Sequence, residues 1–236
     1  MWLLTLQFCI QNQRHPSSAE EDAKNKPWRP ISSGRITPST ATDLLTVVFL
    51  VTSLISYSLG VFPHYAVFTY LAVYHNDFGG SDAHGVIRNA LNAAGFVCFF
   101  SGALKVVIGA GNPLSPMVHQ WIGFFALALL TTIHAQDFRD VEGDELRERS
   151  TITTLVGESS ARWILSVMTV FWSLFLPRWI GVEFCGGTIV AGSGCSVALM
   201  TVKGLGQRNA WLDSVMYRAY NVWLLGLCLL PLGLLT

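Results

Sequence analysis

The sequence is poor in charged residues. Lysine, arginine, aspartate and glutamate together make up 13% of its 236 residues, while 51% are hydrophobic and the mean hydropathy is +0.45. A chain of this composition has too few polar side chains to cover the surface of a globular protein in water. The composition therefore excludes a soluble globular domain and predicts an integral membrane protein.

The signatures of several other protein classes are missing. The five cysteines lie in apolar stretches and never at Cys-x-x-Cys spacing, which excludes a typical zinc site or a secreted disulfide framework. The sequence contains no P-loop, no nucleophile elbow and no nucleic-acid-binding patch. The N-terminal stretch lacks a basic region and a small-residue cleavage site, so it does not resemble a signal peptide. We therefore expect no nucleic-acid partner, and no protein partner is indicated.

Apolar runs cover most of the chain. Most of them approach the ~20 residues that a helix needs to cross ~30 Å of hydrocarbon. Because lipid offers backbone groups no hydrogen-bond partners, we expect these runs to be helices of a single all-α transmembrane domain over residues 1–236. The apolar start of the chain looks like the last part of a further helix whose beginning is absent. The runs lie at about 41–60, 61–75, 90–111, 116–135, 160–176, 179–202 and 214–235.

Basic residues are unevenly divided among the turns between these runs. Thirteen of the fifteen lysines and arginines lie within residues 14–35, at Arg88, within 139–162 or within 203–218, whereas the alternate turns carry only Arg178. If each run crosses the bilayer once, the four basic regions emerge on one side, which the positive-inside rule assigns to the cytosol. Acidic residues follow the same division, so the two acidic clusters of the chain are expected at one cytosolic face.

One acidic cluster follows the run 116–135. Asp137, Asp140 and Asp144 have the spacing i, i+3 and i+7, which would place three carboxylates along one face of a helix. Like charges at this spacing repel one another, and Mg²⁺ is the natural compensating cation because it binds one or two carboxylates and leaves positions for water and phosphate oxygens. The alternative is a charged loop that pairs with itself, for example Glu145 with Arg149.

The other acidic cluster, Glu20-Glu21-Asp22, lies near the N-terminus. It precedes a basic turn, NKPWRPISSGR, in which prolines restrict the backbone around Lys26 and Arg29. A basic loop opposite a carboxylate-bound cation would hold an anionic leaving group between them. The alternative is an ordinary cytosolic loop that obeys the positive-inside rule.

The two clusters together resemble the paired aspartate motifs of the UbiA superfamily of intramembrane prenyltransferases. DAKNKPWRPISSGRIT is similar to the segment that closes the first motif, and DFRDVEGD resembles the second motif. The sequences EED and NKPWRP look most like those of the fungal branch, which includes membrane terpene cyclases. The resemblance implies a bundle of nine transmembrane helices around a central cavity, with both motifs at its cytosolic opening binding magnesium and an isoprenoid diphosphate.

The resemblance also implies roles for individual residues. Asp22 matches the last carboxylate of the first motif, Asp140 and Asp144 match the second motif, and all three are expected to be catalytic. Asn12 matches the opening asparagine of the first motif only if two residues are inserted. The expected magnesium ligands are Asn12, Glu21, Asp22, Asp137, Asp140 and Asp144; the expected diphosphate-binding residues are Lys26, Arg29, Arg88, Arg139 and Arg147; the candidate cavity residues are Tyr70, Tyr74, Trp121 and Phe125.

The chain departs from the family pattern in three ways. Ser18 falls where the first motif has its middle aspartate, so Glu20 or Glu21 would have to supply that oxygen. A Tyr-x-x-x-Lys element is missing, because no lysine follows Tyr74, and Arg88 is a candidate for the phosphate contact. The opening helix is absent and the second is short, which keeps a non-catalytic relative open as an alternative.

These features predict a Mg²⁺-dependent enzyme of secondary metabolism that ionises farnesyl or geranylgeranyl diphosphate. The resulting cation would react with its own double bonds to give a terpene, or with an aromatic or other acceptor in a prenyl transfer. The similarity of these motifs to the fungal branch favours cyclisation. By analogy with the family, we expect a multi-pass protein of an internal membrane, the endoplasmic reticulum.

Two features inside the apolar runs have alternative interpretations. Gly186, Gly187, Gly192 and Gly194 form a loose glycine-rich stretch, which we interpret as permitting close helix packing. Lys105 is a basic residue deep in an apolar run, so it is either functional or reaches along the helix toward the turn at 111–116.

Overall fold

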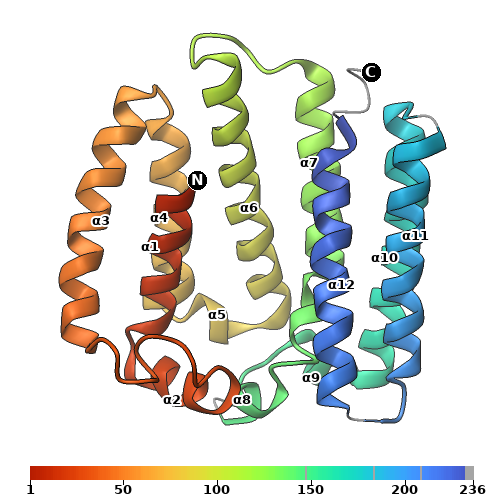
Figure 1. Cartoon of the computed structure of the whole chain (residues 1–236), viewed down its shortest axis with the longest axis horizontal. Coiled ribbons are helices and arrows are strands. Elements are labelled where there is room, and N and C mark those ends of the chain that lie inside the picture. Colours follow the sequence, from red (N-terminus) through yellow and green to blue (C-terminus); the bar gives the residue numbers. More distant parts are fainter. Residues whose placement is uncertain (147, 183, 208, 232–236) are drawn as a thin grey trace. The chain divides into compact units, whose positions relative to one another are not determined.

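The structure is all-helical over the part of the chain that it describes. The computed structural model describes residues 1–146, 148–182, 184–207 and 209–231, and every regular element in these residues is a helix (Figure 1). The expected all-α fold is therefore confirmed. The expected phosphate ligand Arg147 lies outside the described residues.

Seven long helices coincide with the seven apolar runs, and a shorter helix, α1 (Trp2–Gln13), precedes them. Five short elements connect the long ones: α2 (Pro16–Asn25), α5 (Gly80–Ala83), the 3₁₀ helix η1 (Ile133–Gln136), α8 (Val141–Leu146) and α9 (Ile152–Val156). The long helices are α3 (Pro38–Ser58), α4 (Phe62–Asp77), α6 (Gly85–Ile108), α7 (Pro116–Thr132), α10 (Glu158–Ile180), α11 (Phe184–Lys203) and α12 (Ala210–Leu229).

Local sequence explains where several of these helices begin and end. Thr37 accepts a hydrogen bond from the Thr40 amide at the start of α3, and Asn209 accepts one from Leu212 at the start of α12, as side chains preferred at helix N-termini do. Helix α10 ends at Gly181, whose φ of 76° is the left-handed conformation that glycine adopts without strain. The helix boundaries thus follow from capping chemistry as well as from hydrophobicity.

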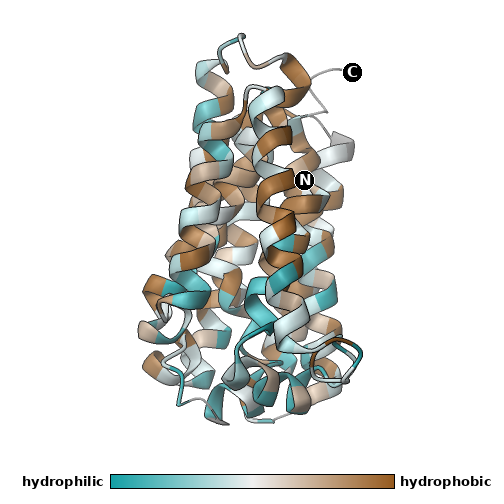
Figure 2. Ribbon diagram, turned by 90° about the vertical axis from the view of Figure 1, so that its left-hand side faces the viewer, coloured by the Kyte–Doolittle hydropathy of each residue, from teal (hydrophilic) through white to brown (hydrophobic). Residues whose placement is uncertain are grey.

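Among the described residues, four helical segments are long and apolar enough to cross a membrane. They are Pro38–Ser58, Gly85–Ile108, Pro116–Gln136 and Glu158–Ile180, with hydropathies of 1.6, 1.8, 1.4 and 1.4. Figure 2 shows hydrophobic residues along the long helices and hydrophilic ones concentrated where the short connecting helices lie. This pattern is that of an integral membrane protein.

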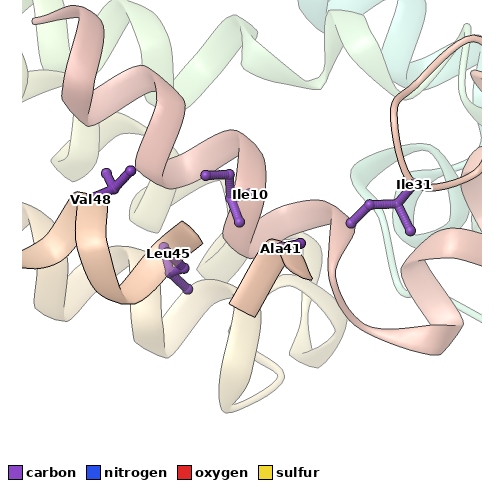
Figure 3. Packing of buried hydrophobic residues seen from close by; sticks show 5 residues of the cluster. All are labelled: Ile10, Ile31, Ala41, Leu45 and Val48. Carbon is purple, nitrogen blue, oxygen red and sulfur yellow. The ribbon is translucent and has the colours of Figure 1, made fainter. Parts of the chain in front are cut away.

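The helices form two compact units, which are described separately. The first unit comprises Met1–Gly123 and Glu142–Ser150. In it α1 packs against α3 and α4, and α4 packs against α6. A core cluster joins α1, the basic turn and α3 (Figure 3), and it consists of Ile10, Ile31, Ala41, Leu45 and Val48.

Lys105 belongs to the first unit and resolves one of the alternatives above. Its ammonium group donates a hydrogen bond to the backbone carbonyl of Asn112, in the segment that follows α6. The side chain therefore reaches along the helix toward a polar backbone group, which is the snorkelling arrangement.

The second unit comprises Phe124–Val141 and Thr151–Thr236, with α10 packed against α11 and α11 against α12. A polar contact lies inside this packing, where the indole of Trp223 donates a 2.8 Å hydrogen bond to the Ser173 hydroxyl. Gly194 lies against the same pair, because a Cβ atom added there would be 1.9 Å from Ser173 Oγ and 3.1 Å from Trp223 Nε1. The interpretation of the glycine-rich stretch as a packing feature is therefore confirmed at Gly194.

Gly194→Ala is expected to destabilise the second unit. The added methyl group overlaps the Ser173 hydroxyl, and overpacking of this kind costs about 1–3 kcal/mol. Gly192→Ala on the same helix is the matched control, since its Cβ would meet no atom within 4 Å. The denaturant midpoint of each variant in detergent, followed by circular dichroism, measures the difference. Equal midpoints for the two variants would contradict the packing role.

Candidate active site

The three aspartates Asp137, Asp140 and Asp144 do not share a helical face, so that prediction is wrong. The chain passes from η1 into a turn before α8 begins, and the amide of Asp137 bonds to the His134 carbonyl three residues back. These i to i−3 contacts break the α-helical repeat on which the face depended. Asp137 and Asp140 belong to the second compact unit, whereas Asp144 belongs to the first.

A charged cluster lies in the first unit, where α2, α5 and α8 lie at the same end of the unit (Figure 1). At its centre is Arg149, a residue that is 93% buried. It donates to Asp82 Oδ1 at 2.8 Å, to Asp144 Oδ1 at 2.6 Å and to Glu21 Oε2 at 2.9 Å. One arginine therefore holds carboxylates from three separate parts of the sequence.

Glu21 is the acidic residue of the first motif that reaches this cluster. Glu21 is buried, whereas Glu20 is exposed. Helix α2 approaches α8 closely, since a Cβ added at Gly143 would lie 2.6 Å from Glu21 Cγ and 2.2 Å from the Asn25 amide nitrogen. The glycine of the VEGD sequence thus permits the contact that brings Glu21 beside Asp144. Of the two residues considered in place of Ser18, the structure brings Glu21 to the cluster.

Asp144 has one carboxylate oxygen without a hydrogen bond. Oδ2 is buried and has no hydrogen-bond partner among the described residues, and the Arg88 Nη1 atom lies 3.8 Å away. Burial raises the pKa of Asp144 above its ordinary value, although the positive charges of Arg88 and Arg149 act in the opposite direction. The expected phosphate ligand Arg88 is therefore beside the second motif.

Asp22 is buried and paired with Arg29 in the basic turn. Arg29 Nη1 lies 2.8 Å and 2.9 Å from the two oxygens of Asp22. Burial raises the pKa of Asp22, while the hydrogen bond and charge of Arg29 and the charge of Lys26 partly oppose that shift. The first motif and its basic turn are thus joined by a direct ion pair, and Asn12 lies before the helix break, on α1.

The second unit contains a separate arrangement around Asp140. Arg139 donates a hydrogen bond from Nε to Asp140 Oδ1 at 2.9 Å and another from Nη2 to Asp140 Oδ2 at 3.2 Å, so the ion pair is bidentate. The guanidinium group of Arg139 lies 4.3 Å from the centre of the Tyr217 ring. Asp137 is also buried in this unit. Within the unit, Arg139 is therefore a direct partner of Asp140.

An apolar cavity lies in the first unit, next to the charged cluster along α6. Its volume is about 220 Å³, somewhat below the ~300–1,000 Å³ typical of small-molecule sites. Arg88 is one turn before Asn92 on α6, so the helix leads from the charged cluster to the cavity wall. The lining residues are Thr5, Phe8, Phe68, Leu71, Ala72, His75, Asn92, Gly95, Phe96 and Phe99.

The four residues expected to line a cavity are not among the residues that line this one. Tyr70 is 70% exposed and Tyr74 is 40% exposed, and neither lines this cavity. They lie on α4, but the residues of α4 that line the cavity are Phe68, Leu71, Ala72 and His75. Tyr70 and Tyr74 therefore do not contribute to this cavity, and their expected role stays a prediction. Trp121 and Phe125 are buried on α7, as a cavity role would require, but do not line this cavity.

The cluster combines carboxylates with buried guanidinium groups. Carboxylate oxygens are ligands that Mg²⁺ prefers, and the Oδ2 atom of Asp144, which accepts no hydrogen bond from the described residues, is one such oxygen. In the described part of the chain, no three acidic, histidine or cysteine side chains are arranged to hold a metal ion. Arg149 instead provides the positive charge between Glu21 and Asp144. Arg149 is thus the counterion of these two carboxylates in the structure.

Comparison with known proteins gives a consistent family and related enzymes. The model of the UbiA prenyltransferase family matches residues 1–225. The chain is 33% identical to fumagillin beta-trans-bergamotene synthase of Aspergillus fumigatus over 233 residues, 96% of this chain and 76% of that protein. It is 27% identical to somaliensene A/B synthase of Streptomyces somaliensis over 232 residues, 94% of this chain and 73% of that protein.

Two further comparisons concern transferases and the fold. The chain is 27% identical to polyprenyl transferase eriF of Hericium erinaceus over 170 residues, 69% of this chain and 55% of that protein. A solved structure of digeranylgeranylglyceryl phosphate synthase matches with a TM-score of 0.55 and 15% identity, covering 97% of this chain and 84% of that one. The structural match supports the same helical fold.

Arg149→Leu is expected to destabilise the protein by about 3–5 kcal/mol, because it leaves buried carboxylates without their counterion. Arg218→Leu, at an exposed position of α12, is the matched control. Denaturant titration in detergent measures both variants. Millimolar Mg²⁺ is expected to stabilise Arg149→Leu more than the wild type, since the freed carboxylates can then bind the metal. No loss of stability in Arg149→Leu would contradict the counterion role.

Proposed function

The chain belongs to the UbiA prenyltransferase family, and from this premise we propose that it ionises an isoprenyl diphosphate and cyclises the hydrocarbon to a terpene. The observation that carries the proposal is the position of the charged cluster of Glu21, Asp144, Arg88 and Arg149 beside an apolar, phenylalanine-lined cavity. An isoprenyl diphosphate has the same two parts, a strongly anionic head and an apolar chain. The similarity to two terpene synthases over more than nine-tenths of this chain favours cyclisation.

Arg88 and Arg149 would bind the diphosphate. A guanidinium group presents paired N–H donors that match phosphate oxygens, and its charge persists at every physiological pH. Both arginines are buried, so their charges are screened less by water than those of surface residues. They would stabilise the negative charge that grows on the leaving group as the carbon–oxygen bond breaks.

Magnesium is proposed as the cofactor. Glu21 and Asp144 would hold it, and the buried Oδ2 atom of Asp144, which accepts no hydrogen bond from the described residues, supports this role. When bound, the metal would add positive charge at the diphosphate and make it a better leaving group. Asp22, Asp137 and Asp140 stay candidate ligands from the family motifs.

The cavity would fold the chain and protect the cation. Ten residues line it, and four of them are phenylalanines. Aromatic faces attract cations, and an apolar wall keeps water from capturing the intermediate. Because Asn92, Phe96 and Phe99 follow Arg88 on the same helix, a diphosphate at Arg88 would have its chain directed along α6.

Prenyl transfer to an acceptor is the second candidate function. The family and the similarity to a polyprenyl transferase support it, and it would use the same ionisation step. We also propose that the protein resides in the endoplasmic reticulum with its charged segments in the cytosol, as the distribution of basic residues favours.

An assay on membranes that carry the full chain tests the proposal. Farnesyl and geranylgeranyl diphosphates are supplied separately with Mg²⁺, and we expect release of diphosphate together with a volatile hydrocarbon. Chelation of the metal with EDTA is expected to stop the reaction. Release that requires an added aromatic acceptor would favour transfer. No release under any of these conditions would exclude an enzyme acting on these substrates.

Asp144→Asn is expected to lower the rate of diphosphate release on the order of 100-fold or more, because the amide keeps the shape of the side chain but removes the charge that would hold a cation. Asp43→Asn at an exposed position of α3 is the control and is expected to retain activity. Membrane abundance is measured for both variants by immunoblot. Full activity in Asp144→Asn would remove Asp144 from the site.

A further inference from the structure

His75 lies where the charged cluster meets the apolar cavity. His75 is 93% buried on α4 and lines the cavity. The centre of its ring lies 5.6 Å from the centre of the Phe8 ring. It also lies within electrostatic reach of Arg88, Arg149 and Asp82 of the cluster. A lone histidine in an apolar run belongs to no motif that would mark it in the sequence.

Hydrogen bonds to Asn76 determine which nitrogen of His75 has a free lone pair. The Asn76 amide nitrogen donates a 2.8 Å hydrogen bond to the Ala72 carbonyl one turn earlier. This contact turns Asn76 Oδ1 toward His75 Nδ1, at 3.3 Å. Because an amide oxygen can only accept, Nδ1 must carry the hydrogen. In the neutral ring Nε2 is then the basic atom.

The Nε2 atom of His75 does not stabilise the fold through a hydrogen bond to any described residue. It is buried, and it has no hydrogen-bond partner among the described residues. A buried acceptor without a partner lowers stability, so such a group is often retained for function. Of the ten residues that line the cavity, His75 is the one whose side chain carries a basic ring nitrogen.

We propose that His75 accepts the proton that ends the cyclisation reaction, an inference that rests on the proposed function. A carbocation becomes a neutral olefin when a C–H bond beside the cationic carbon breaks and its electron pair forms the new C=C bond. The proton moves to Nε2 and converts the imidazole to an imidazolium. It later leaves with the diphosphate product, so the overall reaction releases hydrocarbon, diphosphate and one proton and needs no oxidant or reductant.

The carboxylates nearby are less suited to this step. Glu21, Asp82 and Asp144 already accept hydrogen bonds from Arg149, and none of them lines the cavity. The ring of His75, in contrast, forms part of the cavity wall. A carbocation is so strongly acidic at its neighbouring C–H bonds that a neutral imidazole suffices as the base.

The test compares His75→Asn and His75→Phe with the wild type in detergent or nanodiscs. Each protein receives the diphosphate substrate that the wild type uses, with Mg²⁺. Diphosphate release is measured in solution, and hydrocarbons and alcohols are identified by gas chromatography with mass spectrometry. His119→Asn, at an exposed histidine of α7, is the matched control. Unfolding midpoints show which variants keep their structure.

In the His75 variants, formation of the principal hydrocarbon is expected to fall on the order of 100-fold, the low end of the effect of removing a general base. Diphosphate release is expected to fall much less, because ionisation precedes proton loss. Other olefin isomers and water-captured alcohols are expected to replace the principal product. A purely structural role would lower release and product together and leave the product ratio unchanged.

The possible failures can be distinguished. If the wild type forms no hydrocarbon, the proposed function fails and the inference fails with it. If the wild type forms a hydrocarbon and folded His75 variants keep its rate and product ratio, His75 is not the proton acceptor, although the proposed function stands. If neither variant folds, Asn76→Leu decides, because it removes the acceptor that sets the tautomer; an unchanged product ratio there overturns the inference.

Discussion

The charge of Arg149 is the constraint on which the candidate site depends. Its guanidinium group holds Glu21 from α2, Asp82 from α5 and Asp144 from α8, and Glu21 lies 128 positions from Arg149 in the chain. Buried carboxylates that repel one another would not stay together without a cation. This one side chain therefore explains why the two acidic motifs can meet in a membrane protein, where little water is available to solvate their carboxylates.

The site combines two environments that oppose each other physically. Charged groups need partners and polarity, while a carbocation needs a wall that excludes water. In the first compact unit, α6 connects the two, since Arg88 contacts Asp144 and residues from Asn92 onward line the cavity. His75 reaches the same boundary from α4. An amphiphilic substrate suits this gradient from charge to hydrocarbon.

Much of the fold followed from hydrophobicity alone. Each of the seven long helices coincides with an apolar run, because backbone groups in lipid can be satisfied only within helices. The common location of the basic and acidic segments in the first unit also agrees with the charge pattern. The helical face of Asp137, Asp140 and Asp144 did not follow, because spacing predicts a shared face only if the helix continues, and here a 3₁₀ turn interrupts it.

The sequence by itself determined the membrane class, the helix positions, the family motifs and the presence of a carboxylate-rich site. Only the tertiary structure decided that Glu21 rather than Glu20 enters the cluster, that Tyr70 is exposed, and that His75 lines the cavity. The physical reason is that hydrophobic periodicity specifies which residues form helices. The close approach at Gly143 and the pairing with Arg149 depend on contacts between distant segments, which local pattern does not encode.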